Sequence, residues 1–267
     1  MKTRIAHGLR RLALASLAFV LLTGLLAAFT PAEVALAEYE EIMALTPNFA
    51  NGHKAYITCA VCHRPEGWGT LDGTYPQIAG QHRTVIIKQL ADIRARNRDN
   101  PLMYPFSVPR VLGGPQNIAD VAAYVSQLPM NPQNGVGPGT DLELGAQLYK
   151  DNCVKCHGEG GQGDEQEHTP AIAGQHFNYL VRQFDAIRDG RRRNSDPKMV
   201  EQIKGFAPRE AMAVLDYTSR LRPPAERLGM ADWRNPDFRG YVYPTPPGPA
   251  PSSPMTQPPA LPIPTQP

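Results

Sequence analysis

The sequence has little of what defines several common protein classes. Four cysteines in 267 residues are too few for a scaffold held together by disulfides. A net charge of +2 excludes a polybasic nucleic-acid-binding protein as the default interpretation. Only 7% of the residues are aromatic, although the 42% that are hydrophobic suffice for a core. There is no nucleotide-binding glycine fingerprint after a strand-like run, no zinc-protease motif and no nucleophile elbow.

Proline is abundant but unevenly distributed. Of the 28 prolines, 14 lie in the last 45 residues. From Pro244 to the end of the chain, 11 of 24 residues are proline, separated mainly by serine, threonine and glutamine. Because such a composition cannot bury a core, we expect residues 223–267 to form an extended, disordered tail.

The first 37 residues have the pattern of an export segment. Basic residues precede an uncharged, mostly apolar run at 12–29, and the Ala-Leu-Ala sequence at 35–37 fits a signal-peptidase site. The apolar run is long for a signal core and close to the lower limit for a membrane span. Residues 1–37 are therefore interpreted as a signal peptide, with an uncleaved membrane anchor as the alternative. Both place the rest of the chain in the periplasm, free or anchored to the inner membrane.

One unit occurs twice in the chain. Residues 59–63 (CAVCH) recur as residues 153–157 (CVKCH). Residues 76–82 (PQIAGQH) recur as residues 170–176 (PAIAGQH), and both recurrences lie 94 residues further on. A repeat of this length with matching internal spacing indicates two copies of one small domain.

Helical periodicity defines the organisation of these copies. Apolar residues recur at intervals of three and four in both, and no strand-like alternation competes. We expect an all-α protein with domains at 38–134 and 135–222, each built on about three main helices. The Pro/Gly-rich linker at 129–139 is short, so the domains should lie side by side. Thr140 and Glu143 predict a capping box at the start of the following helix.

The doubled Cys-x-x-Cys-His motif is typical of c-type haem attachment. Two thiols three positions apart on a helical turn face the same side, so each can form a thioether to one vinyl group of the porphyrin. The adjacent histidine then supplies an axial nitrogen to the iron. We therefore expect two covalently bound haem c groups. The predicted attachment residues are Cys59, Cys62, His63, Cys153, Cys156 and His157.

Two other chemistries use Cys-x-x-Cys pairs. The two pairs could bind one zinc ion together, but each pair carries its own set of predicted helices. A redox-active pair is also an alternative, but the βαβ context that it would require is absent. The doubled motif and the export segment favour haem.

Each copy offers a methionine as the sixth iron ligand. Met103 lies 40 residues after His63, and Met199 lies 42 residues after His157. Both methionines belong to a Pro-x-Met sequence between the second and last predicted helices. A thioether opposite histidine raises the reduction potential and closes the iron to small ligands.

Two further residue pairs repeat with the motif. His82 and His176 are the alternative sixth ligands, although a polar or hydrogen-bonded role at a helix start is favoured for both. Pro76 and Pro170 each lie 13 residues after the motif histidine. A proline carbonyl can accept the second N–H of a ligating imidazole, so we expect these carbonyls to hold the histidines.

These features together resemble the di-haem cytochrome c4 family. The resemblance covers about residues 48–222 and rests on the two haem motifs, the doubled Ile-Ala-Gly-Gln sequence and the two late methionines. It implies two tandem class I cytochrome c domains with the axial ligands named above. The first unit departs from the family pattern at 64–69 (RPEGWG), where a small glycine-rich loop is usual. Trp68 in this segment packs either on the haem edge or over the core.

The resemblance implies periplasmic transfer of single electrons rather than enzymatic catalysis. The expected partners are a membrane dehydrogenase or cytochrome complex as donor and a terminal oxidase or other reductase as acceptor. An alternative is a haem subunit of a membrane complex, anchored through residues 12–29. A di-haem enzyme acting on a sulfur compound or peroxide would need an open iron, which neither unit indicates. The Arg191–Arg193 run is interpreted as a solvated helix end rather than a contact for an acidic partner.

Overall fold

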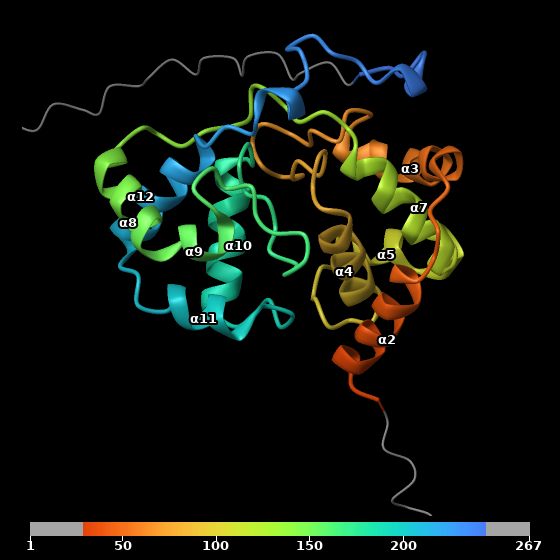
Figure 1. Ribbon diagram of the computed structural model, residues 1–267, viewed down its shortest axis with the longest axis horizontal. Helices are drawn as coiled ribbons and strands as arrows, with labels where there is room; N and C mark the ends of the chain where they lie inside the picture. The colour runs from red at the N-terminus through yellow and green to blue at the C-terminus, as the bar shows by residue number, and fades with distance from the viewer. Residues whose placement is uncertain (1–28, 244–267) are drawn as a thin grey trace, which may run out of the picture.

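The computed structural model describes residues 29–243, and all regular elements in this part of the chain are helical. They form two units that lie side by side (Figure 1). The first unit contains α2 (Pro31–Met43), α3 (Phe49–His63), α4 (Arg83–Arg94), α5 (Tyr104–Ser107), α6 (Pro109–Leu112) and α7 (Pro115–Ser126). The second contains α8 (Leu142–Asn152), α9 (Val154–His157), α10 (Phe177–Arg188), α11 (Pro197–Ile203) and α12 (Pro208–Ser219). The predicted all-α class and the two tandem units are confirmed.

The same frame of three main helices occurs in both units. The first helix packs on the last, α3 on α7 and α8 on α12, and α4 or α10 completes each unit. Glycine stands where the first and last helices cross. A Cβ on Gly52 would collide with the carbonyl oxygen of Asp120, and one on Gly145 with that of Ala213. These two positions therefore admit only glycine at the observed helix separation.

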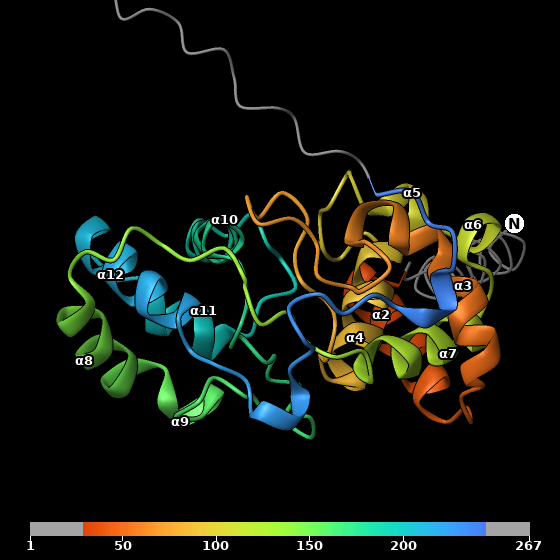
Figure 2. The ribbon, with the colours of Figure 1, turned by 90° about the horizontal axis from the view of Figure 1, so that it is seen from above.

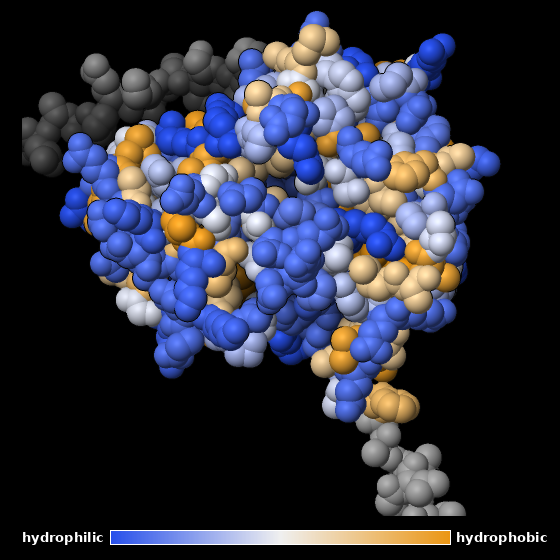
Figure 3. All heavy atoms as spheres, viewed as in Figure 1, coloured by the Kyte–Doolittle hydropathy of each residue, from blue (hydrophilic) through white to orange (hydrophobic). Residues whose placement is uncertain are grey.

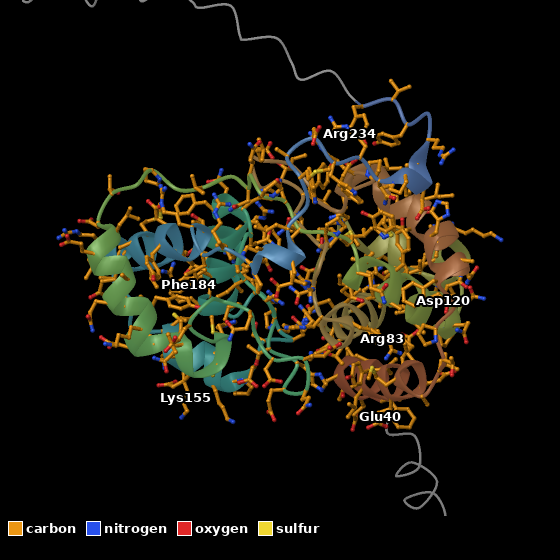
Figure 4. All side chains as sticks on the ribbon, turned by 45° about the horizontal axis from the view of Figure 1, so that its top comes forward. Glu40, Arg83, Asp120, Lys155, Phe184 and Arg234 are labelled. Atoms are coloured by element: carbon orange, nitrogen blue, oxygen red, sulfur yellow. The ribbon has the colours of Figure 1, made fainter. Side chains whose placement is uncertain are left out.

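Each unit buries its own core. Tyr56 and Ile118 are fully buried in the first unit, and Tyr149 is buried in the second. Phe184, labelled in Figure 4, lies inside the second unit as well. The apolar residues at helical spacing on α7, namely Ile118, Val121, Ala122 and Val125, are all buried. Of the apolar residues at helical spacing on α4, Ile93 is buried, whereas Ile86 and Leu90 are only partly buried. Leu90 instead lines a cavity beside Cys59 and Cys62.

The capping box predicted at the start of α8 is wrong. The N-cap is Asp141 rather than Thr140, and it has a positive φ of 54° with no side-chain cap. Its carboxylate instead accepts from Arg209 on α12, with an Nη2–Oδ1 distance of 2.6 Å. This ion pair lowers the pKa of Asp141. A contact with a distant helix thus replaces the local cap that the sequence suggested.

Residues 31–37, predicted as the end of the export segment, belong to helix α2. Thr30 and Glu33 cap the helix, and α2 packs on α4 and α7 with Ile42 fully buried. Glu38 pairs with Arg94 of α4 at 2.6 Å. The predicted boundary at residue 37 therefore falls inside a packed helix. Residues 1–28, with nearly all of the apolar run, lie outside the described part of the chain. Among the helices within 29–243, none is long and apolar enough to span a bilayer.

Residues 223–243, expected to start a disordered tail, fold back over the first unit. We call them the C-terminal strap; in Figure 1 they cross the top of the molecule toward α3. The strap contains the 3-10 turns η1 (Ala225–Arg227) and η2 (Pro236–Phe238). Trp233 and Phe238 pack against the first core. The predicted tail therefore begins too early, and residues 244–267 lie outside the described part.

The buried centre of the strap is Asn235. Its Nδ2 donates to Pro65 O at 2.6 Å and to Tyr124 Oη at 2.9 Å. Trp68 lies beneath the strap, 8% exposed, with its ring 5.9 Å from that of Trp233. Of the two placements that the sequence left open for Trp68, the structure thus supports a cover over the core.

Candidate functional site

A cavity opens beside the first Cys-x-x-Cys-His motif. Helix α3 ends at His63, so both cysteines stand on its last turns. The lining residues are Thr58, Cys59, Cys62, His63, Leu90, Met103, Phe106 and Leu112. The fold therefore brings Met103, the predicted sixth ligand, into one cavity with the predicted attachment residues. The rest of the lining is almost entirely apolar, as a largely apolar ring system requires.

The second motif is presented in a slightly different way. Helix α8 ends before Cys153, and the short α9 carries the motif to His157. Cys153 and Met199 both pack against the second core, Met199 from the first turn of α11. Asp196 caps α11 by accepting from the Met199 backbone N–H, which fixes the start of that helix.

Both motif histidines are held by the predicted proline carbonyls. His63 Nδ1 lies 2.9 Å from Pro76 O, and His157 Nδ1 lies 3.1 Å from Pro170 O. Because a carbonyl can only accept, Nδ1 carries the proton and Nε2 keeps its lone pair for a metal. Burial lowers the pKa of both imidazoles, which favours the neutral, ligating form.

The surroundings of Cys59 and Cys153 favour an uncharged sulfur over a thiolate. Burial raises the pKa of the Cys59 and Cys153 thiols to about 12. A reactive or zinc-binding cysteine needs a thiolate, so these surroundings disfavour both alternatives. All four cysteines lie in the described part, and none forms a disulfide there. Within residues 29–243 no three Cys, His, Asp or Glu side chains gather as a metal site. A neutral thioether fits this apolar setting.

Comparison with known proteins identifies the family to which these sites belong. The cytochrome c family profile matches residues 49–129 and again residues 142–220. The chain belongs to the cytochrome c family. The two matched segments coincide with the two helical units, so this cytochrome carries two covalently attached haem c groups and transfers electrons.

Relatives place the cytochrome beside the di-haem c4 proteins. Cytochrome c4 of Thiocapsa roseopersicina is 33% identical over 181 residues, which cover 63% of this chain and 89% of the relative. A protein of Stutzerimonas stutzeri strain A1501 named thiosulfate dehydrogenase electron acceptor is 29% identical over 199 residues, covering 67% of this chain and 90% of the relative.

Solved structures agree in fold. Reduced recombinant cytochrome c4 from Pseudomonas stutzeri has a TM-score of 0.59 at 24% identity, covering 66% of this chain and all of that one. The thiosulfate dehydrogenase TsdBA from Marichromatium purpuratum has a TM-score of 0.56 at 27% identity, covering 64% of this chain and 40% of that one.

Two glutamines of the repeated Ile-Ala-Gly-Gln sequence join the units of the cytochrome. Gln175 accepts from Gln77 N at 3.1 Å and donates to Gln77 O at 2.8 Å. Gln81 makes the same two bonds with Ala171, at 3.0 and 2.9 Å. Gln81 matches Gln175 in the repeat, and Gln77 matches Ala171, so the contact has approximate two-fold symmetry. Figure 2 shows the loops of both units meeting between α4 and α10.

The repeated histidines also bind the opposite unit. His176 Nε2 donates to Trp68 O at 2.7 Å, and its Nδ1 accepts from Gly135 N at 3.0 Å. His82 Nε2 lies 2.8 Å from Gln162 O, and Gln162 is the repeat counterpart of Trp68. Both ring nitrogens of His176 are engaged, so it is no sixth ligand. The hydrogen-bonded role is confirmed, but the partner in the other unit was not foreseen.

His176 predicts a pH dependence of stability that a variant can isolate. Burial lowers the pKa of His176 below its ordinary 6.5. As the pH falls below about 6.5, His176 becomes protonated in the unfolded chain but stays neutral in the folded one. The free energy of unfolding therefore decreases by up to about 1.4 kcal/mol for each unit by which the pH is lowered. In guanidinium titrations between pH 7.5 and 5.5, His176→Gln should show the smaller loss. Identical pH slopes for the two proteins would contradict this role.

The arginine run at 191–193 is not simply the solvated helix end that the sequence predicts. Two of its three side chains contact the first unit. Arg192 donates to Gln89 Oε1 of the first unit at 3.1 Å, and Arg193 donates to Arg96 O at 2.7 Å. These two side chains therefore add to the contact between the units, and only Arg191 remains among residues of its own helix end.

The residue after the first motif holds a glycine-like backbone conformation. Arg64 has φ 65° and ψ 161°, close to the 77° and 163° of its counterpart Gly158. The carbonyl oxygens accept from equivalent tyrosines, Tyr56 at 2.7 Å and Tyr149 at 2.8 Å. A side chain in this region costs on the order of 1–3 kcal/mol. The departure seen in the sequence is thus a point of strain beside His63.

Replacing Arg64 with glycine should stabilise the first unit. The expected gain is about 1 kcal/mol, because relief of strain exceeds the extra chain entropy that glycine loses on folding. The matched variant Gly158→Ala should destabilise the second unit by a similar amount. Guanidinium unfolding of both holoproteins measures the effects. An unchanged or lowered midpoint for Arg64→Gly would show that the strain is offset by contacts of the arginine.

Proposed function

We propose that this cytochrome carries single electrons in the periplasm between a respiratory donor and an acceptor such as a terminal oxidase, and is not itself an enzyme. The observation that carries the proposal is the pairing of histidine with methionine. Met103 shares a cavity with His63, and Met199 and Cys153 both pack against the second core. A site closed by two protein ligands favours electron transfer over substrate binding.

In such a carrier the residues of the protein bind the haem groups and hold their ligands in a fixed orientation. When bound, haem supplies a one-electron iron couple. The proline carbonyls fix the imidazole planes, and the apolar lining excludes water, which limits reorganisation around a change of charge. The glutamine and histidine contacts hold the units in one relative position, so the path between the two sites keeps its length.

A redox titration with added ligands tests the proposal. Both haems of the full-length holoprotein should titrate at high potential and show the weak near-infrared band of Met-ligated ferric haem. Neither should bind cyanide or carbon monoxide rapidly. One haem that lacks the band and binds carbon monoxide quickly would overturn the carrier proposal and indicate an active site.

Thiosulfate oxidation is the second candidate for the electron source. Two relatives are named thiosulfate dehydrogenase electron acceptors, and a solved thiosulfate dehydrogenase shares the fold at 27% identity. If the donor is such an enzyme, thiosulfate plus a thiosulfate dehydrogenase should reduce this cytochrome rapidly. Thiosulfate alone should not. Reduction by thiosulfate alone would instead indicate enzymatic activity of the chain.

Membrane association is the remaining part of this proposal. If the export segment is cleaved, the cytochrome is free in the periplasm; if it is retained, the apolar run at 12–29 tethers the cytochrome to the inner membrane, with the donor or acceptor in the same membrane. Release of the full-length protein by osmotic shock, without detergent, would contradict tethering.

A further inference from the structure

Five large hydrophobic side chains are exposed around the first site. Ile57 is 54% exposed and Val61 69%, one helical turn apart on α3. We name the group of five side chains the apolar rim. Figure 3 shows hydrophobic surface on the same unit, in the region of α5. The rim consists of Ile57, Val61, Leu102, Phe106 and Val111.

The residues of the apolar rim are direct sequence neighbours of the residues that line the cavity, or line it themselves. Phe106 lines the cavity itself, and the other four rim residues each precede a lining residue in the chain. Val61, for example, stands between Cys59 and Cys62, and Leu102 directly precedes Met103. Any protein that approaches the first haem along this face therefore meets the rim.

The second unit shows that the fold does not require apolar residues here. The repeat matches Val61 with Lys155 and Leu102 with Lys198. On the preceding helix, Ile57 directly follows Tyr56 and Lys150 directly follows the equivalent Tyr149. All three lysines are exposed, and Lys155 projects from the outer surface (Figure 4). Gln202, also exposed, takes the place of Phe106. The same helical frame thus presents an apolar face at one site and a polar face at the other.

We propose that the apolar rim docks a redox partner protein through an uncharged, apolar patch on that partner, and that the second site serves a chemically different surface. This inference rests on the proposed function. Lys54, one helical turn before Ile57, and Arg110, directly before Val111, are both exposed; an apolar centre with polar neighbours is the arrangement that protein interfaces share. An apolar contact of this kind is insensitive to salt, whereas the lysine face of the second unit is not.

The size of the rim favours a transient partner over a second copy of this chain. Five partly exposed side chains offer less than the roughly 800 Å² per partner that a stable interface buries. Small interfaces are typical of brief electron-transfer encounters, in which fast release matters as much as binding.

Voltammetry on coated gold electrodes tests the rim with the full-length holoprotein. The two probes are a methyl-terminated alkanethiol monolayer, which imitates an apolar patch, and a carboxylate-terminated one. Wild type should exchange electrons rapidly with the methyl surface at low and high salt. The double variant Val61→Lys/Leu102→Lys should exchange about tenfold more slowly there, equivalent to roughly 1.4 kcal/mol.

The matched control is the double variant Lys155→Glu/Lys198→Glu. It should keep the fast exchange with the methyl surface and lose exchange with the carboxylate surface. Potentials measured in solution should remain high in all three proteins, and this measurement separates a failure of the rim from a failure of the carrier proposal. Equal exchange of wild type and Val61→Lys/Leu102→Lys on the methyl surface would overturn the inference. So would sedimentation showing a wild-type dimer that this variant dissociates, because a second copy would then occupy the rim.

Discussion

Replacing Met103 with alanine is expected to lower the reduction potential of the first haem by a substantial part of the roughly 0.8 V range that axial ligands span. The structure places Met103 in the cavity with His63, and alanine has no sulfur with which to ligate. The first haem should also lose its near-infrared band and bind carbon monoxide. Potentiometric titration and ligand binding measure these changes, and the second haem should keep its potential and its band.

Two variants control this prediction. Met199→Ala should transfer the same changes to the second haem, since Met199 is the repeat counterpart of Met103. Met212→Ala removes a methionine that is 43% exposed on α12 and should leave both haems unchanged. If Met103→Ala retained two Met-type bands and two high potentials, Met103 would not be the sixth ligand.

Truncating the chain after Arg222 is expected to destabilise the first unit by on the order of 5 kcal/mol. The deletion removes Trp233 and Phe238 from the first core. It also removes Asn235 from its bonds to Pro65 O and Tyr124 Oη, so that buried polar groups lose their partners. Guanidinium unfolding, followed through the haem absorption, should show an early transition of the first unit and an unchanged second unit.

Truncation after Tyr243 is the matched control, because it keeps the whole strap. This shorter deletion should unfold like the full-length cytochrome. Asn235→Ala should give an intermediate loss of about 1–3 kcal/mol. If the two truncated proteins were equally stable, the C-terminal strap would contribute nothing to the stability of the first unit.

Local chemistry explains what the sequence could predict. The two cysteines of each motif stand three positions apart on a helical turn, which places them on one face. The proline carbonyls and the late methionines recur at nearly fixed spacing in both units. The structure accordingly brings Met103 to Cys59 and holds His63 on Pro76. The repeat itself supplied the second set of assignments.

Tertiary contacts explain what the sequence could not predict. Helix α2 has the small and apolar residues of an export segment, and only its packing on α4 and α7 shows it to be structural. The strap has a loop-like composition and is held by a few side chains such as Asn235. His176 and Gln175 gave a visible signal, their exact repetition, but their partners lie in the other unit, about 100 residues away.

The reciprocal glutamine contacts have a consequence for the origin of the chain. Gln77 of the first unit binds Gln175 of the second, and their repeat counterparts, Ala171 and Gln81, bind each other. Such a reciprocal contact is called isologous and is the kind found in a two-fold homodimer. A single unit of this kind could therefore pair with an identical copy through the same bonds. Fusion through residues 129–139 makes that pairing intramolecular and frees the copies from symmetry. Val61 and Lys155 could then diverge, which no homodimer of one gene product allows.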